Sequence, residues 1–295
     1  MDTRDEVREF LVSRRARITP EQAGLPSFGG TRRVAGLRRA EVALLAGVSP
    51  DYYTRLERGN LSGVSESVLD AIARALRLDD AERSHLYDLA RAANTAPRAR
   101  RRPAGAQIRP GVRNLLDAMT HAPAFVRNGR LDILAANQLG QALFAPAFDT
   151  PDRPVNLARF CFLDPRAADL YDDWEDAANA TVALLRTEAG RDPYDKTLTD
   201  LVGQLATLSD DFRTRWAAHN VRLHHTGVKQ FHHPTVGRLD LGFEAMPLPA
   251  DPGLTIVAYS AQPGTPTHEA LRLLASWEAT ADARTGPANA DGARP

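Results

Sequence analysis

Apolar residues in the first 93 positions recur at the three- and four-residue spacing of an α-helix. Ser65 is a suitable N-cap, and Asp79 with Glu82 has the spacing of a capping box, so both mark helix starts. The helices expected from these signals lie around residues 7–11, 37–46, 50–58, 65–76 and 79–90. A loop rich in Gly and Pro separates the first two. The pattern predicts an all-α first domain of five helices.

The pattern changes after Gln107, where short apolar runs with the two-residue period of strands appear beside helical segments. Asn128-Gly129 separates two such runs and is a strong hairpin signal. The expected strands cover residues 124–127, 131–135, 229–232, 239–245 and 254–260, and the expected helices cover 113–119, 137–144, 165–220 and 267–277. Strands at both ends and helices between them predict an α+β domain with a helical insert.

These patterns divide the chain into four segments. We expect a helical first domain over residues 1–95, a linker over 96–106, a second domain over 107–277 and a disordered tail over 278–295. The linker and the tail are both rich in Ala and Pro and show no apolar period. The arginines of the linker fit phosphate contacts or a solvated tether equally well.

The net charge of the chain is zero, but its two parts differ. Residues 1–102 contain 19 Arg, no Lys and 14 acidic residues, a charge of +5, and the remainder carries −5. This asymmetry indicates that only the first part contacts an anionic partner. The single cysteine, Cys161, excludes an internal disulfide. The charged N-terminus and the lack of a long apolar run predict a cytoplasmic protein without a membrane partner.

Residues 37–59 have the features of a helix-turn-helix. Gly47 stands where the turn needs a left-handed backbone, and Ala43 is small where the two helices cross. Ser49 can cap the second helix, and Pro50 suits its first position. These positions agree with one another, which favours DNA binding over the enzymes and protein-binding domains that share this geometry.

The second helix of this pair then presents Asp51, Tyr52 and Arg55 to a duplex. Arg55 can donate two hydrogen bonds to guanine, Asp51 can accept from cytosine, and Tyr52 can contact a thymine methyl or a phosphate. Arg38 and Arg39 begin the first helix, where they can meet phosphates. With Ser49 and with Arg32 and Arg33 of the preceding loop, they complete the set of DNA-binding candidates. The loop is either an arm that reaches the DNA or a plain surface loop.

The stretch LRRAEVALLAGVSPDYYTRLERG resembles the helix-turn-helix of the Xre/Cro-like family, over roughly residues 5–93. The resemblance implies a five-helix phage-repressor-like fold with the positions of Arg39, Asp51, Tyr52 and Arg55 at the DNA. Pro50 stands at another such position, but it has no side-chain donor and is excluded as a base reader.

Segments such as NGRLDILAANQLGQALF and GVKQFHHPTVGRLDLGFEAMPLP resemble the MmyB-like ligand-binding domain, over about residues 107–277. The resemblance implies a PAS-like fold around an apolar cavity and a small hydrophobic ligand such as a fatty acid. The family pattern often has Trp where this chain has Ala136, a change expected to reshape the cavity.

Six residues of the second domain, with apolar, aromatic or amide side chains, are candidates for lining a ligand pocket. They are Phe125, Leu134, Asn137, Trp174, Trp216 and Phe231. The tryptophans can either contact a ligand or serve as anchors of the core. Asn137 can either contact a ligand or cap the helix that it begins. The pairs His224-His225 and His232-His233 each direct side chains to opposite faces of a strand, so no metal site is expected.

No nucleophile elbow, dinucleotide fingerprint or zinc-protease helix is found, so we expect neither an enzyme nor a cofactor. The sequence therefore predicts a DNA-binding regulator that recognises a double-stranded operator as a homodimer and responds to an apolar ligand. The alternative is a regulator whose second domain serves protein interaction or dimerisation without a ligand.

Overall fold

The computed structural model describes residues 3–25, 34, 36–94, 108–218 and 225–285. The chain forms two compact units: residues 1–104 with 178–223, and residues 105–177 with 224–295. We call them unit 1 and unit 2. The expected linker and the loop arginines Arg32 and Arg33 lie outside the described residues.

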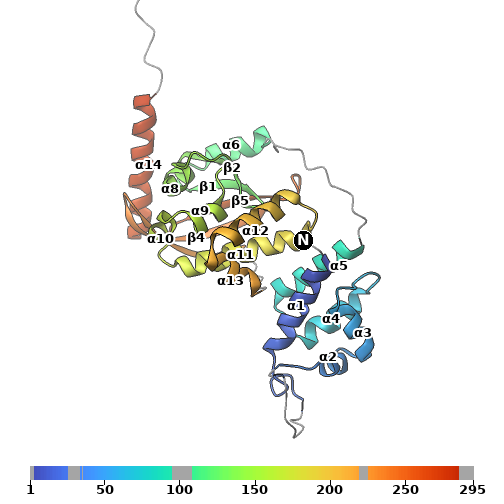
Figure 1. Ribbon diagram of the computed structural model, residues 1–295. Coiled ribbons are helices and arrows are strands. Elements are labelled where there is room, and N and C mark those ends of the chain that lie inside the picture. The colour runs from blue at the N-terminus through green and yellow to red at the C-terminus, as the bar shows by residue number, and fades with distance from the viewer. Residues whose placement is uncertain (1–2, 26–33, 35, 95–107, 219–224, 286–295) are drawn as a thin grey trace, which may run out of the picture. The chain divides into compact units, whose positions relative to one another are not determined.

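Unit 1 begins with the five helices expected from the sequence (Figure 1). They are α1 (Thr3–Arg17), α2 (Arg39–Ala46), α3 (Pro50–Glu57), α4 (Glu66–Ala75) and α5 (Asp80–Asn94). Their apolar faces form one core that includes Phe10, Val42, Tyr53, Ile72 and Leu86. Burial of each such side chain stabilises the fold by roughly 1.5–3 kcal/mol, so this face fixes the helix packing.

Three further helices also belong to unit 1: most of α11 (Trp174–Arg191), with α12 (Lys196–Leu208) and α13 (Asp210–Ala217). The sequence predicts these helices, but as an insert of the second domain. In the structure the helical residues from 178 onward instead group with the DNA-binding helices in unit 1. The buried Arg186 of α11 bonds Glu6 of α1 in this unit, and helical periodicity does not reveal such a partner.

Unit 2 is built on an antiparallel sheet with the strand order β2-β1-β5-β4-β3. Its strands are β1 (Ala124–Asn128), β2 (Ile133–Ala136), β3 (Thr226–His233), β4 (Gly237–Pro247) and β5 (Leu254–Ser260). In β4 the buried Leu239, Leu241 and Phe243 alternate with exposed Arg238 and Asp240. The two-residue period therefore places one face of the sheet in the core, which confirms the α+β class.

Helices pack on both faces of this sheet. One face, with Phe125 and Tyr259, packs against the short helices between β2 and β3. The other face, with Val126 and Ile256, packs against Val112 of the helix before β1. These helices are α6 (Pro110–Ala118), α7 (Gln138–Leu143), α8 (Ala145–Phe148), α9 (Leu157–Leu163), α10 (Arg166–Leu170) and, at the C-terminal end, α14 (Pro266–Thr285).

The β1–β2 hairpin forms where the sequence predicts it, although its turn is longer than two residues. The Asn128 side chain accepts hydrogen bonds from the backbone N–H groups of Arg130 (2.9 Å) and Asp132 (3.0 Å). Leu131 takes the left-handed conformation, with φ 66°. The asparagine thus organises the turn through its side chain, and a leucine carries the backbone conformation expected of a glycine.

The last helix is longer than expected. The sequence predicts its end at Trp277 and a disordered tail from residue 278, whereas α14 continues to Thr285. Alanine is the strongest helix former, and four of the residues 275–283 are alanines, so helix propensity extends α14 without an apolar period. Residues 286–295 lie outside the described part of the chain.

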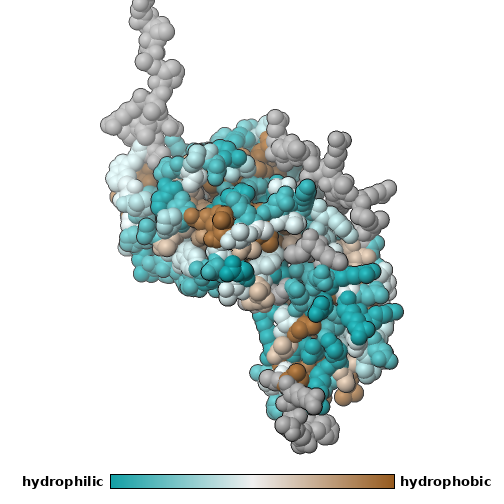
Figure 2. Space-filling model, in the orientation of Figure 1, coloured by the Kyte–Doolittle hydropathy of each residue, from teal (hydrophilic) through white to brown (hydrophobic). Residues whose placement is uncertain are grey.

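The visible surface is mostly hydrophilic, with small apolar patches (Figure 2). None of the helices in the described residues combines the length and the apolar character of a membrane span.

Candidate functional site

The turn between α2 and α3 has the geometry that DNA recognition requires. Gly47 ends α2 with φ 65° and ψ 30°, the left-handed conformation expected from the sequence. The Ser49 hydroxyl accepts a hydrogen bond from the Tyr52 backbone N–H at 3.1 Å, and Pro50 fills the first helical position. Backbone and cap together fix the direction in which α3 leaves the turn.

The exposed face of α3 carries the candidate base readers. Asp51 and Arg55 are exposed, Tyr52 is half-buried, and Tyr53 points into the core. The guanidinium carbon of Arg55 lies 4.9 Å from the centre of the Tyr52 ring. This cation–π contact holds the exposed Arg55 side chain beside Tyr52 on the outer face of the helix.

Arg38 and Arg39 differ in their surroundings although both are exposed. The Arg38 backbone N–H donates to the Glu41 carboxylate at 2.6 Å, which caps the first turn of α2. Arg39 instead donates through Nε to Glu57 Oε1 at 2.8 Å. The charge of Arg39 is therefore partly neutralised, whereas the Arg38 side chain projects from the helix start.

Glu57 ends α3 and is 1% exposed. Its carboxylate also accepts from Nε of Arg15 at 2.7 Å, so α1, α2 and α3 meet at one buried acid. Burial acts to raise the pKa of Glu57, but the hydrogen bonds from Arg15 and Arg39 outweigh it and lower that pKa. Glu57 thus stays charged and fixes the end of the candidate recognition helix.

Sequence reasoning missed Glu57. Its signal was present, because Tyr53, Leu56 and Glu57 share the inward face of α3 at three- and four-residue spacing. An acid on an apolar face needs a cationic partner, which the arginines of α1 and α2 supply. Arg58, which follows α3 and is exposed, is a further cation on this surface that the sequence analysis did not name.

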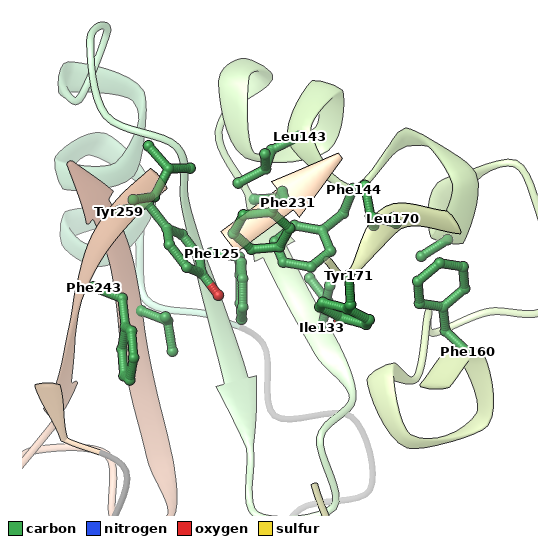
Figure 3. Close-up of a cluster of buried hydrophobic side chains, with 14 of the residues drawn as sticks. Phe125, Ile133, Leu143, Phe144, Phe160, Leu170, Tyr171, Phe231, Phe243 and Tyr259 are labelled. Atoms are coloured by element: carbon green, nitrogen blue, oxygen red, sulfur yellow. The ribbon is translucent and has the colours of Figure 1, made fainter. Parts of the chain in front are cut away.

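Aromatic rings gather on one face of the unit 2 sheet (Figure 3). Phe125 and Phe144 meet edge to face at 5.5 Å between ring centroids, and Phe144 and Phe231 do so at 5.6 Å. Tyr259 lies 5.6 Å from Phe231. Burial raises the pKa of Tyr259 well above its usual value, so its hydroxyl stays protonated. We call these four residues, with Tyr171, the aromatic cluster.

The structure brings together two of the six candidate pocket residues, Phe125 and Phe231, in this cluster. Trp174 packs against the larger core around the cluster and donates from Nε1 to the Cys161 carbonyl at 2.9 Å. Leu134 packs on the opposite face of the sheet. Trp216 belongs to unit 1, where it stacks on Phe212 with 5.6 Å between centroids.

Asn137, the remaining candidate, is a structural cap. Its side-chain oxygen accepts from the Gly140 N–H (2.7 Å) and the Ala124 N–H (2.9 Å). Its amide nitrogen donates to the carbonyls of Met119 (2.7 Å) and Ala122 (2.8 Å). Four hydrogen bonds occupy this amide, as the helix-cap alternative requires.

Ala136 lies at the aromatic cluster. It is buried, and it pairs with Phe125 across the β1–β2 hairpin. A tryptophan at this position would therefore project toward the rings.

A more polar cavity of about 760 Å³ lies elsewhere in unit 2. The loop after α6, the start of α7 and one face of α14 form its walls, with charged groups on Asp117, Glu269 and Arg272. Sites for apolar molecules have mainly hydrophobic walls and few polar groups. The aromatic cluster is the more apolar of the two places, and its rings are in contact with one another.

Of the four tandem histidines, His224 lies outside the described residues. His225 and His232 are exposed, and His233 is buried. His233 accepts from the Thr235 N–H at Nδ1, so Nε2 carries the proton and donates to the Ala142 carbonyl at 3.0 Å. Within the described ranges, the structure brings no three metal-ligating side chains together.

Two family models match the sequence. The model described as MmyB-like transcription regulator ligand binding domain matches residues 108–274, which is more than half of the chain. A model described as a helix-turn-helix domain matches residues 27–86. No curated protein matches the chain. Both resemblances in the sequence are therefore confirmed, and both models describe regulatory domains.

Proposed function

The chain belongs to the family of the MmyB-like transcription regulator ligand binding domain, and on that premise we propose how its two parts work. With its helix-turn-helix it is a DNA-binding transcriptional regulator. We propose that α3 reads a specific operator in the major groove and that a small hydrophobic ligand, of the fatty-acid class, changes this binding. The protein then works in the cytoplasm, without catalytic activity of its own.

One observation carries the DNA-binding proposal: the turn at Gly47 and the Ser49 cap hold α3 so that Arg55 faces solvent beside Tyr52. A guanidinium group presented on a short exposed helix matches the O6 and N7 acceptors of guanine. Arg38, at the start of α2, is placed to contact a phosphate next to the groove.

The test selects duplexes from a random pool with the full chain and then measures affinity at fixed salt. Arg55→Ala should weaken binding to the selected duplex by about 5- to 150-fold, the equivalent of one bidentate base contact. Arg74→Ala is the matched control, because Arg74 is an exposed arginine in the last turn of α4. Equal losses for both variants, or no selected duplex at all, would contradict the proposal.

The aromatic cluster is the proposed ligand site because its rings are buried and, apart from the tyrosine hydroxyls, apolar. Its edge-to-face contacts at 5.5–5.6 Å mean that the rings already touch, so a ligand would have to rotate them apart. The proposal places this rotation at Ala136, a small buried side chain that pairs with Phe125.

Native mass spectrometry of the purified full chain tests this site. The expected result is a bound lipid-like mass that Ala136→Trp removes and Leu134→Ala keeps, because Leu134 packs on the other face of the sheet. Loss with both variants, or with neither, would place the ligand elsewhere. Tetradecanoate is the probe to add when no mass co-purifies. If added tetradecanoate does not increase the mass of the native chain, the proposal of a fatty-acid-class ligand is wrong.

A protein-interaction role for unit 2 is the alternative, and one observation favours it. Leu273 and Trp277 lie one turn apart on α14 and are both about half exposed. Single exposed apolar residues are common, but a pair on one helix face fits a second copy of the chain. Sedimentation of Leu273→Ala/Trp277→Ala should then show a monomer where the native chain is a dimer, and an unchanged dimer would exclude α14.

A further inference from the structure

A buried guanidinium group joins α11 and α13 to α1, the first helix of the DNA-binding part. Arg186 of α11 is 0% exposed and donates through its two terminal nitrogens to Glu6 Oε1 of α1 and to the Trp216 carbonyl at the end of α13. Its guanidinium carbon lies 4.0 Å from the centre of the Trp216 ring. Three helices are thus held at one charged side chain.

Such a contact specifies geometry more than it adds stability. Removing two charges from water costs free energy that offsets much of their mutual attraction. Apolar residues of the same size at such positions therefore often stabilise a protein equally well. The planar guanidinium, however, bonds its partners only in a fixed direction. The Arg186–Glu6 pair therefore determines how α11 lies against α1.

A second close contact lies nearby, between α11 and α5. A Cβ atom at Gly190 would lie 2.5 Å from Cε1 of His85, so only glycine permits this approach. His85 Nε2 is 3.8 Å from Glu6 Oε1, and the ring meets Phe10 edge to face at 5.0 Å. Helix α11 consequently touches the core of the DNA-binding helices and not merely their surface.

Helix α1 leads from this contact to the candidate recognition helix. Glu6 lies in its first turn and Arg15 in its last, nine residues or about 14 Å further along the helix. Arg15 binds Glu57, the last residue of α3. A movement of α1 at Glu6 would therefore displace a partner of α3.

The opposite end of α11 starts at Trp174, which packs against the buried core of unit 2 that contains the aromatic cluster. Residues 178–223 belong to unit 1, yet they lie within the range that matches the ligand-binding model. We propose that Arg186 is a positioning residue: by holding Glu6 it makes the DNA affinity of α3 depend on the position of α11. This inference rests on the proposed function and names the route by which the ligand site acts on DNA.

A double-mutant cycle on the full chain tests the route without any ligand. Trp174→Ala perturbs the start of α11, and Glu6→Gln/Arg186→Met removes the pair without leaving a lone buried charge. Trp174→Ala should change the Kd for the selected duplex by about fivefold or more when the pair is intact, and by less than about twofold when it is neutral. Equal changes in both backgrounds, or none in the native background, would overturn the proposal.

Two further variants separate coupling from mere packing. Arg191→Met is the matched control on α11. The Arg191 side chain is 54% exposed and its ion pairs with Glu188 (3.7 Å) and Asp88 (4.0 Å) are long, so this variant should preserve the full effect of Trp174→Ala. Arg186→Lys keeps the charge but cannot bond Glu6 and the Trp216 carbonyl in the same plane, so an intermediate effect is expected. If Trp174→Ala changed the Kd as strongly in the Arg186→Lys background as in the native chain, the planar geometry of the guanidinium would not be what transmits the effect.

Hydrogen exchange gives an independent readout if the neutral pair does not fold. Trp174→Ala should speed amide exchange in the first turns of α1 and leave α4 unchanged. Unchanged exchange in α1 would overturn the proposal. A chain that selects no duplex refutes the proposed function, whereas a chain that selects one but shows an additive cycle refutes only the coupling.

Discussion

The two candidate sites are built in opposite ways. The DNA-binding site uses a few exposed side chains, with Arg55 as its centre, which a glycine turn and a serine cap direct outward. The candidate ligand site consists of buried rings such as Phe144 and Phe231, whose position depends on the packing of a whole sheet face. Local backbone geometry therefore determines the first site, and long-range packing determines the second.

The largest expected effect is at Gly59, just after α3. At this residue a strained backbone conformation and a close packing contact occur together, so it tests the contrast between the two most severely. Its φ is 92°, and a Cβ there would lie 2.5 Å from the Arg4 carbonyl oxygen. Gly59→Ala should lower the free energy of unfolding by about 3 kcal/mol or more, because strain and overlap add. Gly47→Ala, with φ 65° and no atom within 4 Å of its Cβ, should cost about 1–2 kcal/mol.

Urea denaturation followed by circular dichroism measures both glycine variants. Equal losses would mean that the chain around Arg4 yields to the added methyl group, and that packing contributes nothing at this end of α3.

Substitution of Glu57 should cause the next largest loss in the free energy of unfolding, because this buried carboxylate holds α1 and α2 to the end of α3. Glu57→Gln should destabilise unit 1 by about 2 kcal/mol, a value that allows for the half-exposed Arg39. Since the folded pKa of Glu57 is lowered, its contribution is complete above the ordinary value of 4.5 and is lost as pH falls through the folded pKa.

Urea midpoints of the native chain and of Glu57→Gln, measured from pH 7 down to pH 3, test this prediction. The gap between the two curves should begin to narrow below about pH 4.5 and close as pH falls through the lowered folded pKa. A constant gap at all pH values would show that the charge of Glu57 is not what joins α1, α2 and α3.

The same contrast explains how far the sequence alone could predict the molecule. Gly47, Ser49 and Asn128 act on neighbouring residues, so the turn and the hairpin were predictable. Contacts between distant residues were not. Glu57 meets Arg15 across 42 positions, and Arg186 meets Glu6 across 180, and no local pattern pairs them. For the same reason the sequence predicted helices over 165–220 but not the unit in which most of them pack.

Ala136 tests the packed site with a smaller effect. Because it pairs with Phe125 beside rings already in contact, Ala136→Trp should overpack unit 2 and cost about 1.5 kcal/mol. Thermal unfolding followed by near-UV circular dichroism measures this loss. A raised midpoint would instead mean that the cluster encloses free volume, and the ligand site would then be largely preformed.

The smallest expected effect concerns the two arginines at the start of α2, and it separates a phosphate contact from a structural one. Each phosphate contact contributes about 0.9 to the slope of log K against log salt. Arg38→Ala should reduce the slope by about this amount, because the Arg38 side chain is exposed at the helix start. Arg39→Ala should reduce it by less, since Glu57 already holds the Arg39 guanidinium at 2.8 Å. Titrations of the selected duplex between about 50 and 200 mM salt measure both slopes. Equal reductions would show that Arg39 leaves Glu57 on binding, so that the buried acid releases a cation to DNA.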